Sequence, residues 1–233
     1  MFHVEHSLLD KRSTLTIKNT RPNVPRGTFK HRTSTQMHIG LYFGSFNPIH
    51  MGHLLISSFI KEEANLDEVR LIISPLNPFK EAEGMLPHHD RLLLAKSALL
   101  DHPKISASDL EFELPIPSYT IDSVKVLQEK EPDSRFSLIM GEDNLEKFHL
   151  WKEQEDLLNR LENVFVYPRH KYEGKKYEGK GSILEVNAPI IDISSTKIRN
   201  RIANQKSISF WVHPSVEAQI YKRDYYNIAV NQL

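Results

Sequence analysis

From Met37 onward, short apolar runs alternate with segments whose apolar residues recur at helical spacing. The runs are short enough to form buried strands, and they cover residues 38–43, 69–74, 135–140, 163–167 and 183–186. The helical segments cover about 50–65, 89–100, 118–130, 142–161, 194–203 and 214–223. Residues 105–114 are expected to form one further extended segment. This alternation predicts a parallel sheet with right-handed crossovers, in a single doubly wound, Rossmann-like α/β domain with C-terminal helices.

The segment Gly44–His53, with the sequence GSFNPIHMGH, joins the first predicted strand to the first predicted helix. Asn47 is suited to the N-cap and Pro48 to the first helical position, where its missing N–H costs nothing. A helix that begins here points free backbone N–H groups and a partial positive charge at the turn, so the turn can bind an anion. In doubly wound sheets ligands bind beyond the carboxyl ends of the strands, which is where this turn would lie.

His50 and His53 are three residues apart in the predicted first turn of the helix, so their imidazoles share one face. Both rings can donate hydrogen bonds to the oxygens of a bound phosphate. Two other uses of the pair are open: ordinary positions on a helix surface, or two metal ligands on one face. The chain contains no cysteine and offers no obvious third ligand at metal-site spacing, so we rank phosphate binding first and predict no protein metal site.

A second candidate anion site lies near the carboxyl end, in the segment 192–199 (DISSTKIR). The hydroxyls near Ser194 can cap a short helix whose first N–H groups face an anion. Lys197 and Arg199 add positive charge, and a guanidinium can hold two phosphate oxygens at once. Taken alone, the segment is better explained as a common helix start followed by a solvated face.

Taken together, the two segments resemble signatures of the nucleotidyltransferase superfamily. Residues 50–53 match its HxGH pattern, and residues 193–199 are similar to its ISSTxIR pattern. The longer string Gly44–His53 looks like the version found in nicotinate-nucleotide adenylyltransferases, and the likeness extends over about 37–230. The resemblance implies an enzyme of NAD biosynthesis that transfers the adenylyl group of ATP to nicotinate mononucleotide, giving deamido-NAD and pyrophosphate.

The resemblance also implies roles for individual residues. His50 and His53 would be catalytic, with His53 nearest the transferred group. The implied ATP contacts are Gly44, Ser45, Phe46, Gly141, Asp143, Ser194, Thr196 and Arg199. The implied contacts to nicotinate mononucleotide are Asn47, Lys80, Thr120 and Trp151, with the Trp151 ring stacked on the pyridine. From its position alone, Trp151 is equally well explained as a core residue. Mg²⁺ would be carried mainly by the ATP phosphates.

Three further strings carry the likeness, and two departures from the family pattern accompany them. The strings are 77–80 (NPFK), 118–122 (SYTID) and 141–145 (GEDNL) with Trp151 after it. The family often has Arg-Pro-Gly where this chain has Tyr167-Pro168-Arg169-His170, which leaves the role of Arg169 open. Ser123 replaces a threonine of the family, a mild change.

The sequence leaves other functions open as alternatives. A sibling transferase that uses phosphopantetheine or a phosphorylated alcohol would carry similar motifs. A class I aminoacyl-tRNA synthetase also has an HxGH-type motif, but this chain is short for one and shows no KMSKS-like loop. A nucleotide-binding module without catalysis is the alternative from another class. The preference for the acid or the amide mononucleotide, and the formation of a homo-oligomer, stay open.

Charge and composition limit which partners and which cellular location are expected. The chain has 30 basic and 30 acidic residues, of which 7 and 2 lie in 1–36, so 23 and 28 remain in 37–233, a net charge of −5. A domain with a net negative charge is a poor candidate for general nucleic-acid binding. No apolar run approaches the ~20 residues that span a bilayer. The absence of cysteine fits a reducing compartment, so we expect a cytoplasmic protein without a membrane partner.

Two polar segments stand apart from the alternating pattern. Residues 1–36 are rich in Thr, Arg and Lys and show no sustained period, so we expect little stable structure there. This segment can be an upstream extension from a misassigned start codon, and a transit peptide is the rival interpretation. Residues 171–180 contain a short tandem repeat and are predicted to form an exposed basic loop. Residues 37–233 are expected to form the active domain.

Overall fold

The computed structural model describes residues 36–75, 84–169 and 183–227. The chain divides into two units, Met1–Ser34 and Thr35–Leu233, and the described residues lie in the second. They form one six-stranded sheet in the order β3-β2-β1-β4-β5-β6, in which every neighbouring pair is parallel. The strands are β1 (His38–Gly44), β2 (Glu68–Ile73), β3 (Ile105–Ser108), β4 (Arg135–Gly141), β5 (Val164–Tyr167) and β6 (Ile183–Glu185).

This strand order confirms the predicted doubly wound fold. β1 lies inside the sheet; the chain adds β2 and β3 on one side, and then crosses over to add β4, β5 and β6 on the other. The direction of winding therefore changes between β1 and β4. The carboxyl ends of these two strands form the switch point at which such sheets bind ligands. The turn after β1 lies there, as the sequence predicted.

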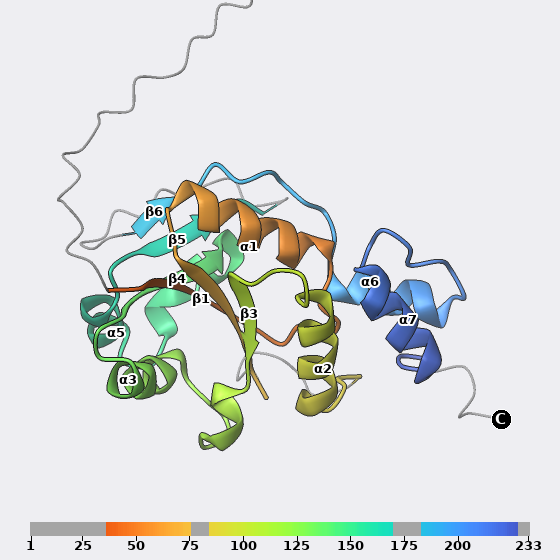
Figure 1. Ribbon diagram of the computed structural model, residues 1–233, viewed down its shortest axis with the longest axis horizontal. Coiled ribbons are helices and arrows are strands. Elements are labelled where there is room, and N and C mark those ends of the chain that lie inside the picture. Colours follow the sequence, from red (N-terminus) through yellow and green to blue (C-terminus); the bar gives the residue numbers. More distant parts are fainter. Residues whose placement is uncertain (1–35, 76–83, 170–182, 228–233) are drawn as a thin grey trace, which may run out of the picture. The chain divides into compact units, whose positions relative to one another are not determined.

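Helices cover both faces of the sheet, as Figure 1 shows. They are α1 (Met51–Glu63), α2 (His88–Ala98), α3 (Thr120–Lys130), α4 (Glu142–Leu145), α5 (Gln154–Arg160), α6 (Ser195–Ala203) and α7 (Pro214–Lys222), with the short 3₁₀ helices η1 (Leu110–Glu113) and η2 (Phe148–Leu150). One buried cluster takes side chains from α1, α2, α6 and α7, and the other takes them from α3 and α5. No helix in the described ranges is long and apolar enough to cross a membrane.

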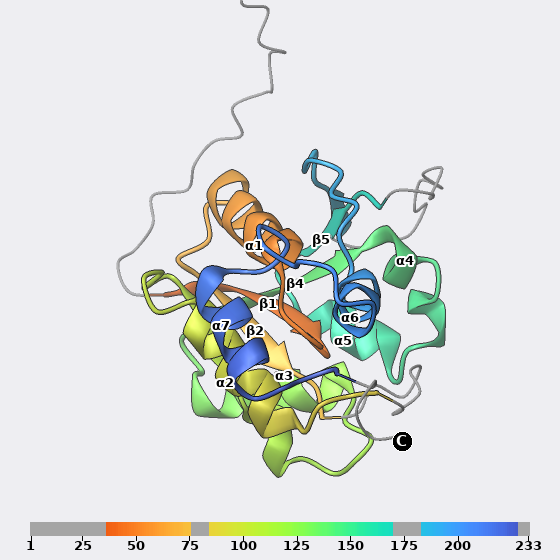
Figure 2. The same ribbon diagram turned by 90° about the vertical axis from the view of Figure 1, so that its right-hand side faces the viewer.

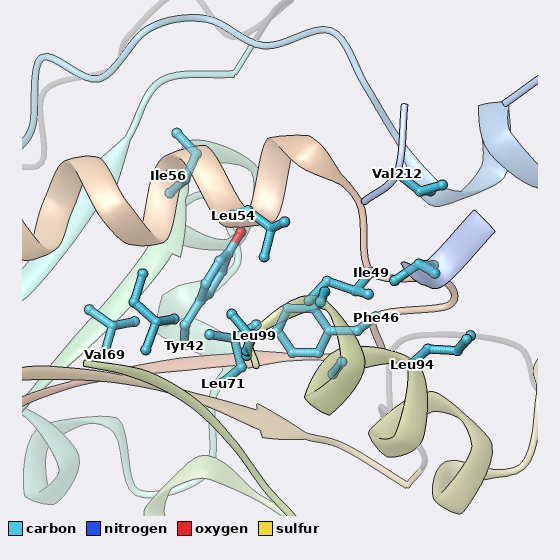
Figure 3. Packing of buried hydrophobic residues seen from close by; sticks show 14 of the residues in the cluster. Tyr42, Phe46, Ile49, Leu54, Ile56, Val69, Leu71, Leu94, Leu99 and Val212 are labelled. Carbon is cyan, nitrogen blue, oxygen red and sulfur yellow. The ribbon is translucent and has the colours of Figure 1, made fainter. Parts of the chain in front are cut away.

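Two hydrophobic cores form because successive side chains of a strand point to opposite faces of the sheet. On β1, Tyr42 packs into the cluster with α1 and α2, while Leu41 packs into the cluster with α3. Figure 3 shows the first core, in which Phe46 and Ile49 from the turn after β1 lie beside Tyr42. Burying each such side chain contributes about 1.5–3 kcal/mol, so packing fixes the turn against the sheet.

Two predicted segments differ in the structure. Residues 105–114, predicted as one extended segment, form β3 and then η1. The chain turns after β3, where the main-chain N–H of Leu110 donates to Ser108 Oγ at 3.2 Å. The predicted helical stretch 142–161 is divided into α4, η2 and α5, and Glu153 has a left-handed φ of 49° just before α5. An α-helix cannot continue through that backbone conformation.

The start of α1 also corrects the sequence prediction. The helix begins at Met51 with His50 as its N-cap, so Asn47 is not the cap and Pro48 is not the first helical residue. The Asn47 side chain is engaged elsewhere, because its Nδ2 donates to the Gly84 carbonyl at 3.1 Å. The turn is therefore longer than predicted, and it connects to a second loop.

Candidate active site

The two histidines of the HxGH motif stack on each other at the start of α1. Their ring centroids are 3.6 Å apart and the planes differ by 23°. The main-chain N–H of His50 donates to His53 Nδ1 at 3.3 Å, which holds the second ring over the helix start. The structure therefore confirms that the two imidazoles share one face.

Gly52 lets the His50 ring lie against the helix. A Cβ at Gly52 would stand 3.0 Å from His50 Nδ1 and 3.1 Å from its Cε1. Contacts this short are tighter than ordinary packing, so any side chain here would push the ring away. The glycine of the HxGH motif thus has a steric role that its spacing alone did not show.

His50 is neutral at physiological pH. The residue is buried, and burial together with the positive charge of Arg169 lowers its pKa to about 3. Its Nδ1 is buried and has no hydrogen-bond partner among the described residues. A neutral imidazole presents one N–H donor and one acceptor, so this ring has unused hydrogen-bonding capacity beside the turn.

A polar network extends from the histidines to the ends of β4 and β5. Tyr42 and Tyr167 share a hydrogen bond of 2.7 Å between their hydroxyl oxygens. Arg169 Nη2 donates to the Tyr167 hydroxyl at 3.0 Å, and Arg169 Nε lies 3.4 Å from Asp143 Oδ1. Burial raises the pKa of Tyr42, so its phenol stays protonated. The network places the Arg169 guanidinium close enough to His50 to lower the pKa of its ring, and the Asp143 carboxylate lies beside that guanidinium.

Gly141, at the end of β4, leaves room for this network. A Cβ on Gly141 would clash with Asp143 Oδ1 and would lie 2.9 Å from Arg169 Nε. The absence of a side chain therefore lets the carboxylate and the guanidinium approach the end of the strand. Gly141 and Asp143, both predicted from the sequence, lie together at the switch point.

The second predicted anion-binding segment meets the first one. Ser195 Oγ donates to the Pro48 carbonyl at 2.9 Å, and Arg199 Nη1 donates to the Asn47 carbonyl at 2.8 Å. These bonds join residues far apart in the sequence and hold the start of α6 against the turn after β1. Figure 2 shows α6 beside the carboxyl end of β1.

The start of α6 has the predicted cap. Ser194 is its N-cap and accepts a hydrogen bond from the Lys197 main-chain N–H at 3.2 Å. Thr196 Oγ1 accepts from Arg199 Nη2 at 3.3 Å, so the hydroxyl and the guanidinium lie together. Lys197 instead pairs with Asp192 through a 2.6 Å contact between Nζ and Oδ1, on the exposed side. Arg199 is therefore the cation of this segment that faces the turn.

A narrow pocket lies between the histidines, the end of β5 and the chain before α6. It is lined by Tyr42, His50, Gly52, His53, Ile56, Tyr167, Pro168, Arg169, Pro189, Ile191 and Ile193. The last two residues lead directly into α6. The histidine pair and the α6 approach thus border the same space, which we call the histidine pocket.

A second pocket of about 100 Å³ lies on the other side of β1, and we call it the tryptophan pocket. It is lined by Phe43, Gly44, Ser74, Glu111, Ser118, Tyr119, Thr120, Ile121, Leu138, Ile139, Met140, Asn144, Leu150, Trp151 and Lys152. The structure therefore brings Thr120 and Trp151 together. Buried Glu111 accepts hydrogen bonds from Ser118 and Ser123, each at 2.8 Å, and stiffens the wall.

The other predicted site residues lie around the turn or outside the described ranges. Ser45 is buried, and Phe46 is a core residue with a left-handed φ of 44°. The Asn47 side chain is bound on both sides, since its Oδ1 also accepts from the Tyr226 hydroxyl at 2.8 Å. Lys80 and the repeat 171–180 lie outside the described residues.

Sequence reasoning missed several side chains that build this edge of the sheet. Tyr226, near the carboxyl end, reaches Asn47, and Arg91 on α2 is fully buried. The one available signal was Arg91 itself, a charged residue directly before the apolar run 92–95 of a predicted helix. Contacts such as Tyr42 with Tyr167 leave no local signal, because they join distant strands.

The fold and the paired helix starts define the class of α/β nucleotidyltransferases. In agreement, the family described as Cytidylyltransferase-like matches residues 41–201, which is more than half of the chain. Its match begins within β1 and ends within α6, so it includes both helix starts.

Similar proteins narrow the assignment further. The "Probable nicotinate-nucleotide adenylyltransferase" of Cytophaga hutchinsonii is 44% identical over 191 residues, which are 82% of this chain and 99% of that relative. The protein of the same name from Flavobacterium psychrophilum is 43% identical over 192 residues, again 82% and 99%. The solved structure of Plasmodium falciparum nicotinic acid mononucleotide adenylyltransferase complexed with NaAD has the same fold, with a TM-score of 0.66, 21% identity and coverage of 82% of this chain and 98% of that one. The chain belongs to the nicotinate-nucleotide adenylyltransferase family.

Proposed function

We propose that this enzyme transfers the adenylyl group of ATP to nicotinate mononucleotide, forming deamido-NAD and releasing pyrophosphate. The observation that carries the proposal is the junction of the two helix starts. Arg199 and Ser195 of α6 bond to the main chain of the turn that leads to the histidine pair. Two positive helix ends that meet at one place suit a polyphosphate. The tryptophan pocket next to them offers an aromatic surface for a flat ring.

The reaction needs no nucleophilic side chain. The phosphate of the mononucleotide is itself an anionic nucleophile; one of its oxygens attacks the α-phosphorus of ATP. The new P–O bond forms as the bond to the bridging oxygen of the β-phosphate breaks, and that electron pair leaves with pyrophosphate. The protein contributes the alignment of two substrates and the stabilisation of charge on the transferred and leaving groups.

We assign the triphosphate to the histidine pocket and to the start of α6. His50 and His53 donate ring N–H groups to phosphate oxygens, with His53 nearest the transferred group. Arg199 holds the leaving pyrophosphate. The other ATP contacts in this proposal are Gly44, Ser45, Phe46, Gly141, Asp143, Ser194 and Thr196. Arg169, whose role the sequence left open, adds positive charge beside His50.

We assign the mononucleotide to the tryptophan pocket. Trp151 stacks on the pyridine ring and Thr120 binds beside it, since both side chains line this space. Lys80 faces the mononucleotide phosphate in this proposal. Asn47 acts through its place in the turn, because its side chain is held by Gly84 and Tyr226.

Mg²⁺ enters the proposed reaction with ATP as the metal–nucleotide substrate. Within the described ranges, no group of three or more His, Asp or Glu side chains could hold a metal ion. Mg²⁺ keeps several waters and binds readily to substrate phosphates, so it would arrive as part of the ATP substrate and would supply positive charge there. We further propose that the protein works in the cytoplasm, without nucleic-acid or membrane partners; a homo-oligomer is compatible with this proposal.

We propose that residues 37–233 carry the whole activity. The family match lies within this range, and so do all of the described residues except residue 36. A protein that starts at Met37 should fold and turn over ATP and nicotinate mononucleotide at the rate of the full chain. A truncated protein that folds, as judged by circular dichroism, but has lost activity would refute this assignment.

The proposed reaction is tested by supplying ATP with different acceptors and measuring pyrophosphate. Nicotinate mononucleotide should give rapid release and a product with the mass of deamido-NAD. Nicotinamide mononucleotide and phosphopantetheine serve as parallel acceptors, so the assay also ranks the acid against the amide. Release that occurs only with phosphopantetheine would indicate a sibling transferase. ATP binding without release from any acceptor would indicate a binding module.

A further inference from the structure

Arg91, on the first turn of α2, is buried completely at the active-site edge of the sheet. Its side chain is 0% exposed. Nη1 donates to the Ser45 carbonyl at 2.5 Å and to the Ser74 carbonyl at 2.8 Å. Nη2 donates to the Pro75 carbonyl at 2.9 Å, and Nε donates to the Leu86 carbonyl at 2.9 Å. One guanidinium thus binds the main chain of three separate loop segments.

Among the residues that the structure describes, Arg91 forms no ion pair with an acidic side chain. Burial lowers its pKa to about 10, so the side chain is still a cation at neutral pH. Burying a cation is costly unless hydrogen bonds compensate for the lost water, and here four main-chain carbonyls accept from the guanidinium. The planar fork of donors is well suited to fixing several carbonyl groups at set angles, so this side chain can set the geometry of the loops in addition to contributing to stability.

The segments that Arg91 holds include one wall residue of the tryptophan pocket and the turn that leads to the histidine pair. Ser45 follows β1 and precedes the HxGH helix start. Ser74 follows β2 and lines the tryptophan pocket. The main-chain N–H of Leu86 donates to Asn47 Oδ1 at 3.1 Å, which connects this third segment back to the turn after β1. A shift of the Arg91 side chain would therefore move both a wall of the tryptophan pocket and the turn that leads to His50.

We propose that Arg91 is a positioning residue that fixes the loops after β1 and β2 in the geometry required to bind both substrates. It touches neither substrate and acts through the main chain of Ser45 and Ser74. The inference rests on the proposed function for the identity of the substrates. Since its bonds hold Ser74 in the wall of the tryptophan pocket and Ser45 in the turn before His50, its loss weakens the binding of both substrates, unlike the loss of a residue that contacts only one.

Arg91→Lys and Arg91→Ala test this proposal in the full-length chain. Lysine keeps the charge but cannot reproduce a planar fork, so the KM values for ATP and for nicotinate mononucleotide should each rise about tenfold or more. Arg91→Ala should show at least the same rise. In Arg91→Ala, guanidinium ion should fill the cavity and lower both KM values part of the way toward wild type, at a concentration far below that which unfolds proteins. Arg135→Ala is the matched control, because Arg135 pairs with Glu162 at the amino end of β4, away from the site.

The outcomes separate positioning from stability. A merely structural Arg91 would lower the melting temperature and leave both KM values within twofold of wild type in the folded enzyme, which would overturn the proposal. Should Arg91→Ala fail to fold, the two KM values of Arg91→Lys decide by the same criterion. Failure of the proposed function is seen separately, as a wild-type enzyme without pyrophosphate release. In that case, ATP binding by the same variants, followed by isothermal titration calorimetry, tests the positioning role, and unchanged affinity would overturn it.

Discussion

The two pockets at the carboxyl edge of the sheet are built in different ways, although they adjoin the same strand. The histidine pocket is narrow, and several of its polar groups are held by other protein groups, as Tyr42 is by Tyr167. The tryptophan pocket is wider, at about 100 Å³, and combines an aromatic ring with a few hydroxyls. Tyr42 and Phe43 belong to different pockets because adjacent residues of a strand face opposite sides.

This difference matches the needs of two kinds of ligand. Charge that develops on a phosphate is stabilised best by donors that are already in place, since no energy is then spent on orienting them. A flat heterocycle needs space and an aromatic face more than it needs fixed charges. We infer that the histidine pocket governs turnover and the tryptophan pocket governs the choice of acceptor. Three substitutions test this division of roles, ordered from the largest expected effect on activity to the smallest, and a fourth tests the protonation state of His50 through folding stability.

The largest effect is expected from His53→Ala. Removing a donor that stabilises the transferred phosphate should lower kcat by ~10²-fold or more. The far-UV circular dichroism should stay unchanged, because the ring contributes little to either core. His102→Ala, an exposed histidine at the opposite edge of the sheet, is the matched control and should keep wild-type turnover. Near-normal kcat for His53→Ala would remove this histidine from the mechanism.

Trp151→Ala should change the other pocket instead. Loss of stacking on the pyridine ring costs about 1–1.5 kcal/mol, so the KM for nicotinate mononucleotide should rise about five- to tenfold. The KM for ATP should stay within twofold. Trp151→Phe keeps an aromatic face and should recover most of the loss. These constants are measured by steady-state kinetics with each substrate varied in turn. An equal rise in the KM for ATP would contradict the assignment of Trp151 to the mononucleotide.

Gly52→Ala is a finer test of the histidine pocket. The added methyl would crowd the His50 ring, whose Nδ1 would lie 3.0 Å from the new Cβ. We expect kcat to fall a few-fold, while stability changes little because alanine favours the helix by about 1 kcal/mol over glycine. Thermal unfolding and kcat are measured on the same preparation. Unchanged kcat would show that the position of His50 does not matter for turnover.

His50→Gln should make the folding stability less sensitive to acid. The unfolded chain protonates this histidine near pH 6.5, whereas the folded state does so only near 3. Folding stability should therefore decrease as the pH falls through this interval, by up to about 1.4 kcal/mol per pH unit. Glutamine takes up no proton, so urea unfolding should show a smaller loss for the variant. Parallel stability curves for the two proteins would contradict a buried, neutral His50.

Much of the fold could be predicted because it depends on local patterns. The apolar run of β1 and the helical spacing after it gave the strand, the turn and α1 to within a few residues. The capping residue of α6 was also predictable, since Ser194 stands directly before a short amphipathic segment. The meeting of the two anion-binding segments followed only from the resemblance to a family, and the bonds of Arg199 and Ser195 to the turn agree with it.

The remaining features depend on contacts between distant parts of the chain. Asn47 has the chemistry of an N-cap, but its amide bonds to Gly84 and Tyr226 instead, and no local pattern predicts such a choice. The helix predicted through 142–161 breaks at Glu153, whose backbone is left-handed although its residue type favours a helix. In both cases tertiary structure overrides a local preference. The role of Arg91 belongs to the same group, because its partners are main-chain carbonyls of separate loops.

A crystal structure of the full chain with a non-reactive ATP analogue tests the central claim most directly. The claim predicts one triphosphate whose oxygens lie within about 2.7–3.2 Å of donors from both helix starts, His53 at α1 and Arg199 or Thr196 at α6. A triphosphate that contacts only one of these helix starts, with the other facing solvent, would contradict it.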